Sequence, residues 1–219
     1  TGPMLSSSHR GKRIGACTDC RRFWGEYRGG RIKEDELKEV TGQLVPSVGT
    51  CGVMGTASTM ACMTEAMGMM LPGGATIPAV LSERLRHSEE TGAHAVKLSK
   101  MKLKPSEIMT PAALKNALRV LLAVGGSTNC LVHLAAIAGR LGVQLDMDAF
   151  NTLGAETPVL VDLKPSGKYY MDDLHRAGGM AVVLRELKPL LNLDCMTITG
   201  RTLGEEIEAS PEPFTQDVV

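Results

Sequence analysis

Helical periodicity is the feature that most constrains this chain, because it covers most of the 219 residues and leaves few stretches for strands. Apolar residues recur at spacings of three and four, and glycines or prolines interrupt the pattern. Only PVLVDL at 158–163 and MTITG at 196–200 have the composition of strands. We therefore expect a helix-rich segment of an α/β domain, whose parallel sheet is partly supplied by sequence outside residues 1–219.

The expected helices are bounded by capping residues, glycines and prolines. They cover 18–28, a short segment after Ile32, 56–70, 77–91, 111–124 and 129–141. Thr56 can cap the third of these helices. Its methionines share one face and are expected to fill the core rather than to bind a metal; they are Met60, Met63, Met67 and Met70. Asp146 and Asp148 are expected at a further helix start.

Composition and charge exclude several classes of function. The chain is 43% hydrophobic and carries 24 basic against 24 acidic residues, with only 3% aromatics. It can therefore bury a core, but it lacks the basic and aromatic surface that nucleic acids need. No stretch reads as a membrane span or a secretion leader, so we expect a cytoplasmic protein. The start TGPML and the end PFTQDVV suggest an internal piece of a longer protein.

Cys51 is the cysteine most suited to chemistry. It lies in a glycine-rich loop just before the helix that Thr56 begins, and the free N–H groups of a helix start favour a thiolate that attacks or binds a metal. Gly49 and Gly52 let the backbone approach a ligand closely. The alternative is a loop cysteine that packs as a small hydrophobic residue. The six cysteines are too few for a disulfide scaffold and are expected to be reduced.

Cys17 and Cys20 form a C-x-x-C pair. A structural zinc site would need a second pair at similar spacing, and the other cysteines are scattered singly. A thiol-redox role would need the pair at a strand-to-helix turn, which RIGACTDCRRFW at 13–24 can provide. A coincidental spacing is the third interpretation.

Two further stretches combine glycines with polar side chains. GGSTN at 125–129 places Ser127 and Thr128 at a helix start, where bare N–H groups suit a carboxylate or phosphate; a simple capped helix is the alternative. In YMDDLHRAGG, Asp172 is expected to cap a helix and His175 to be exposed.

Five motifs together resemble the dihydroxy-acid and phosphogluconate dehydratase family of iron–sulfur hydro-lyases. They are TGPM at 1–4, GTCGVMGTASTM at 49–60, EAMGMMLPG at 65–73, GGSTN at 125–129 and DLHRAGG at 173–179, in the family's order. The resemblance implies that Cys51 is the last of three cysteine ligands to the cluster. The other two, one in a Cys-Asp-Lys motif, lie upstream in the family. The magnesium ligands and the serine base likewise fall outside residues 1–219.

By this resemblance, residues 1–219 are an internal part of the N-terminal iron–sulfur α/β domain, without the family's C-terminal β-barrel domain. The implied reaction removes water from a 2,3-dihydroxy acid to give a 2-keto acid, with an iron of the cluster as Lewis acid and Mg²⁺ holding the substrate. Gly49 and Gly52 would make room for the cluster, and Ser127 and Thr128 would lie near the substrate pocket.

One stretch in which this chain differs from the branched-chain biosynthetic members of the family indicates the substrate class and the cluster type. After Cys51 the chain reads Val-Met-Gly-Thr-Ala-Ser at 53–58, which is more similar to the aldonate dehydratases, and these tend to carry a 2Fe–2S cluster. We therefore expect a sugar acid as substrate and a 2Fe–2S rather than a 4Fe–4S cluster. The alternatives are a branched-chain biosynthetic dihydroxy-acid dehydratase, an inactive α/β fragment, or a thiol-redox protein. A homodimer or tetramer is expected from the family.

Overall fold

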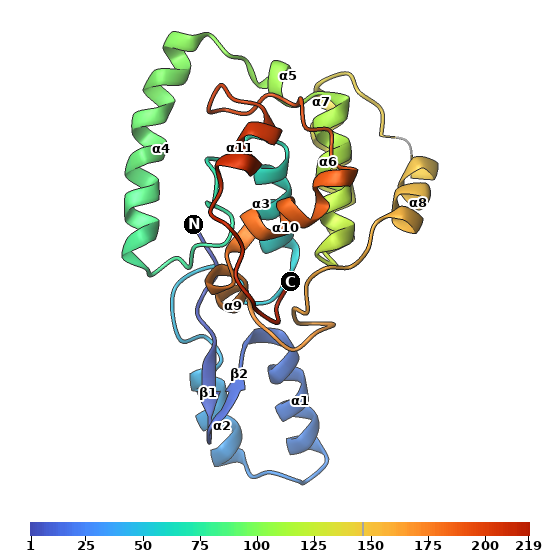
Figure 1. The fold of residues 1–219 in the computed structure, drawn as a ribbon. Helices are drawn as coiled ribbons and strands as arrows, with labels where there is room; N and C mark the ends of the chain where they lie inside the picture. Colours follow the sequence, from blue (N-terminus) through green and yellow to red (C-terminus); the bar gives the residue numbers. More distant parts are fainter. Residues whose placement is uncertain (146) are drawn as a thin grey trace.

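The computed structural model describes residues 1–145 and 147–219, so the predicted helix-start residue Asp146 lies outside the described part. The chain forms a small lower body from residues 5–47 and a larger body from most of the rest (Figure 1). In the small body, the antiparallel strands β1 and β2 precede two helices. Their bounds are β1 Ser7–His9, β2 Lys12–Ile14, α1 Ala16–Arg28 and α2 Glu34–Gln43.

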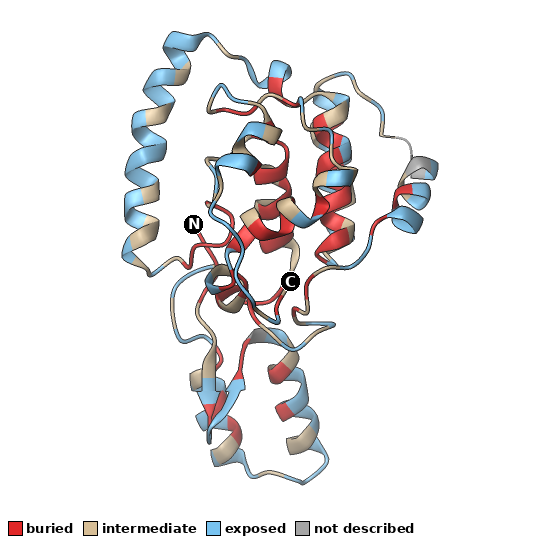
Figure 2. Ribbon diagram, viewed as in Figure 1, coloured by how far each residue is buried: buried red, intermediate tan, exposed pale blue. Residues whose placement is uncertain are grey.

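The larger body is a helical assembly around α3. Its helices are α3 Thr56–Ala66, α4 Ser82–Met101, α5 Pro105–Ile108, α6 Pro111–Ala123, α7 Asn129–Arg140, α8 Met147–Glu156, α9 Met171–Arg176, α10 Gly179–Leu187, the 3₁₀ turn η1 Lys188–Leu190 and α11 Leu203–Ala209. Helix α3 packs most extensively against α6, and α7 and α10 also contact it. Figure 2 shows that buried residues concentrate in α3, α6 and α10.

Each body has its own apolar core. In the small body, Ile14, Phe23 and Val40 are buried among their neighbours on β2, α1 and α2. In the larger body, Met63 of α3 and Met67, the C-cap residue that follows this helix, are buried, whereas Met60 and Met70 are only half-buried. The prediction that these methionines fill the core is therefore confirmed for Met63 and Met67.

Two helix predictions needed correction at their ends. Helix α3 begins at Thr56, but its N-cap is Gly55 rather than Thr56, and it ends at Ala66, four residues earlier than predicted. Helix α4 begins five residues later than predicted and continues through Gly92 to Met101, with no buried residue. A glycine costs an exposed helix about 0.5–1 kcal/mol, which one long helix tolerates. None of the described helices is long and apolar enough to span a membrane.

Neither predicted strand forms. Along 158–163 the backbone N–H groups find separate partners: Leu160 N–H donates to the carbonyl oxygen of Ala123 at 2.8 Å, and Asp162 N–H to that of Val218 at 2.9 Å. Only Leu163 makes an isolated bridge. The segment is thus apolar and buried in part, but no single neighbour runs alongside it.

The second predicted strand, 196–200, instead turns back on itself. Thr197 N–H donates to the carbonyl oxygen of Arg201 at 2.9 Å, and the only bridge joins Met196 to Thr202. In the described residues the only sheet is the two-stranded antiparallel β1–β2 hairpin, and no parallel sheet occurs. The helix-rich character of the fold is confirmed, and the parallel sheet is not found in these residues.

Candidate active-site cleft

The Cys51 loop is held by backbone hydrogen bonds on both sides of the cysteine. Met4 N–H donates to the carbonyl oxygen of Thr50 at 2.8 Å, and Thr50 N–H donates to that of Gly2 at 2.8 Å. After the cysteine, the carbonyl oxygen of Gly52 accepts from Met171 N–H at 2.8 Å. The loop is therefore clamped between the first residues of the chain and the start of α9.

The Cys51 side chain is half-buried, unlike three of the other cysteines. Cys62, Cys130 and Cys195 are buried in the larger body. Burial raises the pKa of all three thiols, most strongly that of Cys62, which disfavours the reactive thiolate form. Of the cysteines in the larger body, Cys51 alone in the described residues keeps part of its surface open to a ligand.

The glycines beside Cys51 allow the first residues of the chain to approach. Gly49 has φ +137°, and a Cβ added there would lie 2.5 Å from the backbone nitrogen of Met4. A Cβ at Gly52 would lie 3.2 Å from the carbonyl oxygen of Met4. Gly49 is thus needed for backbone packing against residues 2–4, and Gly52 makes a close contact with Met4, roles that the sequence did not indicate.

The GGSTN loop meets the start of α3, about 70 residues away in sequence. The hydroxyl oxygens of Thr56 and Ser127 lie 2.9 Å apart, and Ser127 N–H donates to Oγ1 of Thr59 at 3.1 Å. A Cβ at Gly126 would lie 2.5 Å from Cγ2 of Thr59, so only glycine fits there. The structure therefore brings together the two glycine-rich motifs that the sequence singled out separately.

An open cleft of about 690 Å³ lies between these loops and α1. Its lining residues are Cys17, Thr18, Arg21, Val53, Met54, Gly55, Thr56, Gly125, Gly126, Ser127, Thr128 and Pro165. Thr128 is exposed and Ser127 half-buried. Cys51 lies two residues before the lining residue Val53 and is not itself in the wall. Helices α1, α3 and α7 all begin at this cleft, and Arg21 adds a positive charge, so the cleft favours an anionic ligand.

A polar network that sequence reasoning missed lies where the two bodies meet. Tyr170 donates its hydroxyl proton to Oδ2 of Asp19 (3.1 Å), and Lys164 Nζ lies 2.7 Å from the Tyr170 hydroxyl and 3.3 Å from Oδ2 of Asp19. Burial alone would raise the pKa of Asp19, but the Gly15 N–H bond and the Lys164 charge outweigh it and lower that pKa. Burial alone would lower the pKa of Lys164, but the hydrogen bond with Tyr170 and the charge of Asp19 outweigh it and raise that pKa.

The acidic residues of DLHRAGG have structural partners. The N-cap of α9 is Tyr170, and the carboxylate of Asp173, the third residue of the helix, accepts from Tyr170 N–H at 2.9 Å. Asp172 is buried and accepts from Arg176 at 2.7 Å. His175 is half-buried and lies 3.1 Å from a carboxylate oxygen of Glu83. The predictions that Asp172 caps the helix and that His175 is exposed are therefore wrong.

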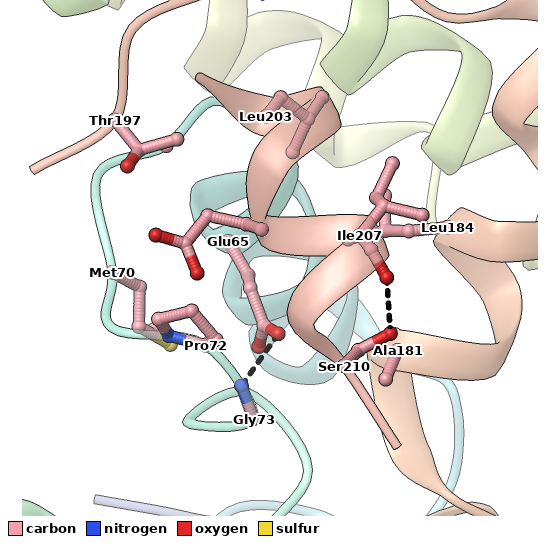
Figure 3. A pocket seen from close by; sticks show the side chains of 12 residues that line it. Glu65, Met70, Pro72, Gly73, Ala181, Leu184, Thr197, Leu203, Ile207 and Ser210 are labelled. Atoms are coloured by element: carbon pink, nitrogen blue, oxygen red, sulfur yellow. Dashed lines mark hydrogen bonds between the residues drawn. The ribbon is translucent and has the colours of Figure 1, made fainter. Parts of the chain in front are cut away.

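Glu65 is a buried carboxyl group beside a small apolar cavity (Figure 3). Its carboxylate oxygens accept from Gly73 N–H at 2.7 Å and from Ala75 N–H at 2.9 Å. Burial raises the pKa of Glu65 to about 7, even though these hydrogen bonds and the charge of Arg84 act in the opposite direction. No local sequence signal marks the Glu65 carboxyl group, because its hydrogen-bond donors Gly73 and Ala75 follow the end of α3.

The described residues do not hold a metal centre by themselves. They contain no group of three or more histidine, cysteine, aspartate or glutamate side chains placed to bind one ion. The half-exposed Cys51 can supply one thiolate ligand. A cluster with several cysteine ligands therefore needs further ligands from elsewhere.

The sequence of this domain was also compared with those of known proteins. The family model "Dihydroxy-acid/6-phosphogluconate dehydratase N-terminal" matches residues 1–206, so the chain belongs to this family. Similar curated proteins are named dihydroxy-acid dehydratase. Those of Caldanaerobacter subterraneus subsp. tengcongensis, Acetivibrio thermocellus and Sulfurisphaera tokodaii are 44%, 42% and 42% identical over 209 residues.

These matches cover 94% of this chain but only 37–38% of the length of those relatives. The chain thus corresponds to a little over a third of such a protein. Family membership rests on the match of the family model over residues 1–206.

Proposed function

We propose that the protein containing these residues is a hydro-lyase that removes water from a 2,3-dihydroxy carboxylic acid to give a 2-keto acid. The observation that carries the proposal is the Cys51 loop, which is clamped at both ends, leaves its thiol half-exposed and adjoins the cleft. Family membership and the names of the similar relatives support the same reaction.

Cys51 is proposed as one ligand of an iron–sulfur cluster, 2Fe–2S rather than 4Fe–4S, with the remaining ligands outside residues 1–219. A half-exposed thiol on a fixed loop fits this role, and the buried cysteines do not. When bound, the cluster supplies a Lewis acid for the departing hydroxyl group. Mg²⁺ is proposed as a second cofactor, with its ligands also outside these residues. Gly49 and Gly52 shape the loop that presents the thiol.

Ser127 and Thr128 are proposed to bind the substrate carboxylate. They lie in the wall of the cleft, at the start of α7 and near Arg21, where hydroxyl donors and positive charge suit an anion. The Ser127 hydroxyl also contacts Thr56, which fixes its position, whereas Thr128 is exposed. Thr128 is therefore the freer of the two to bond a ligand.

The substrate class is proposed to be a sugar acid, on the basis of the run at 53–58. The curated relatives carry the name dihydroxy-acid dehydratase, which favours the branched-chain substrate instead. A panel of aldonates and dihydroxyisovalerate, assayed for 2-keto acid formation with the full-length protein, distinguishes the two. A higher kcat/KM for dihydroxyisovalerate would remove the sugar-acid proposal and leave the hydro-lyase proposal intact.

The first prediction concerns the proposed cluster ligand. Cys51→Ser in the full-length protein should reduce activity at least about 100-fold, because loss of a direct ligand costs more than the 10- to 100-fold typical of groups behind the ligands. The visible absorbance of the cluster should fall with it. Cys20→Ser is the control, since Cys20 is also half-buried but lies on α1 rather than in the Cys51 loop. Full activity and absorbance in the Cys51 variant would refute the ligand assignment.

The second prediction concerns Thr128. Thr128→Val keeps the shape and removes the hydroxyl, so KM should rise at least about tenfold, since a hydrogen bond to a charged group contributes about 1.5–3 kcal/mol. The unfolding free energy should stay unchanged because the side chain is exposed. Steady-state kinetics and urea unfolding measure the two quantities. An unchanged KM would exclude Thr128 from the substrate pocket.

Residues 1–219 alone are proposed to be inactive, because one cysteine does not hold a cluster. Iron reconstitution of this segment should leave it colourless, and a stably bound cluster would contradict the proposal.

A homodimer or tetramer is proposed for the full-length protein, on the family resemblance alone, and light scattering coupled to size-exclusion chromatography tests it.

A further inference from the structure

Cys17 and Cys20 lie on the first turns of a helix that directly follows a strand. Strand β2 ends at Ile14, Gly15 is the N-cap, and α1 begins at Ala16. The strand-to-helix turn that a redox C-x-x-C pair requires is therefore present. This turn does not involve Cys51, although Cys17 lines the same cleft as Ser127 and Thr128.

The helix geometry brings the two cysteines within reach of a disulfide. Residues three apart in an α-helix have Cα atoms about 5 Å apart, inside the range of about 4.4–6.8 Å found for disulfides. Their Cβ atoms, about 5–6 Å apart in a regular helix, must approach to about 3.5–4.5 Å. Closing the pair therefore requires α1 to tighten locally between Cys17 and Cys20, against the hydrogen bond of 2.9 Å that the Asp19 carboxylate accepts from Gly15 N–H.

The two sulfurs have different surroundings. Cys17 is exposed and lines the cleft, together with Arg21 one turn further along α1. Cys20 is half-buried and packs against the core of the small body, which includes Ile14 and Phe23. An external oxidant therefore reaches Cys17 first, and Cys20 is placed to attack the resulting mixed disulfide. The positive charge of Arg21 favours an anionic oxidant at Cys17.

We propose that Cys17 and Cys20 form a reversible dithiol–disulfide site that exchanges with a small anionic disulfide of the glutathione type. The Cys17 thiolate attacks one sulfur of glutathione disulfide, the S–S bond breaks, and one glutathione leaves as a thiolate. The Cys20 thiolate then attacks the Cys17 sulfur and displaces the second glutathione. The protein loses two electrons and two protons in total, and one glutathione disulfide becomes two glutathione thiols.

The full-length protein is equilibrated in buffers of increasing glutathione disulfide to glutathione ratio, quenched with acid, alkylated and cleaved with trypsin. Residues 14–21, IGACTDCR, form one tryptic peptide that holds both cysteines. We expect this peptide to convert from a doubly alkylated form to an unalkylated form two hydrogen atoms lighter than the dithiol, and to return with excess glutathione. A peptide that stays doubly alkylated, or carries glutathione on both sulfurs, would overturn the proposal.

Two serine variants test the order of attack and do not depend on dehydratase activity. Cys20→Ser should accumulate a mixed disulfide with glutathione on Cys17, because the second thiol is missing. Cys17→Ser should leave Cys20 almost unmodified under the same conditions. The buried Cys62, Cys130 and Cys195 serve as internal controls, which should not form a mixed disulfide with glutathione. Equal modification of Cys17 and Cys20 in the two variants, or a crosslink from Cys17 to Cys51, would contradict the assigned pair.

Discussion

Glu65 shows how one buried residue links pH to the stability of the larger body. Its pKa of about 7 in the folded protein lies above its ordinary value of 4.5, because burial disfavours the charge. Between these two pH values the unfolded chain releases the proton and the folded protein keeps it. Stability contributed at this residue is therefore fully present below pH 4.5 and is lost as the pH rises to about 7.

The third prediction uses Glu65→Gln, which keeps the shape of the neutral acid and cannot ionise. The unfolding free energy of the wild type minus that of this variant should fall by about 3 kcal/mol between pH 4.5 and 7. Urea unfolding at several pH values measures the difference. Glu90→Gln, at an exposed position of α4, is the control and should show no such slope. A rising or flat difference for Glu65→Gln would show that the folded protein ionises this carboxyl readily.

Candidate site residues can be picked out of the sequence where the signal is local. Cys51 in its glycine-rich loop, and Ser127 and Thr128 after two glycines, stand out within a few residues of chain. The pairing of Asp19 with Lys164 and Tyr170 does not, because these partners are 145 and 151 residues apart in sequence. No spacing rule predicts that a carboxylate between two cysteines will pair with a lysine so distant.

Among the secondary-structure elements, the helices were predictable and the strands were not. Periodicity is a property of the segment itself, so α1, α6 and α7 were found within a few residues of their ends. A strand also needs a neighbour of matching register. The segment 158–163 has the composition but no such neighbour, whereas the polar β1–β2 hairpin forms through a tight turn with positive φ at Arg10 and Gly11.

The fourth prediction contrasts two glycine-to-alanine changes in different elements. Gly49→Ala should cost about 1–3 kcal/mol from backbone strain alone, and more from the clash with Met4, because its φ is +137°. Gly25→Ala, in the middle of α1 with nothing within 4 Å, should stabilise the protein by about 0.5–1 kcal/mol. Thermal or urea unfolding gives both values. Equal effects of the two changes would mean that the loop adapts to a side chain at Gly49.

For the whole molecule, the small and larger bodies have separate apolar cores and meet through polar groups. The core of β2, α1 and α2 shares no residue with the cores of the larger body. The contacts between them include the Asp19–Tyr170–Lys164 network and the salt bridge of Arg13 with Asp173 at 2.6 Å. Because the cleft lies at this junction, these polar contacts set the position of Cys17 and Arg21 relative to the GGSTN loop.

The fifth prediction tests whether the network holds the two bodies together. Asp19→Ala leaves the partly buried Lys164 ammonium unpaired and removes the acceptor of Gly15 N–H, whereas Tyr170→Phe removes only a hydroxyl group. We expect amide hydrogen exchange in α1 and α2 to accelerate strongly with Asp19→Ala and weakly with Tyr170→Phe, while α3 and α6 stay protected. Lys168→Ala, which breaks an exposed ion pair with Asp162, should change neither body. Equal acceleration in all four helices would show that the molecule unfolds as one cooperative unit, with the two cores coupled through more than their polar contacts.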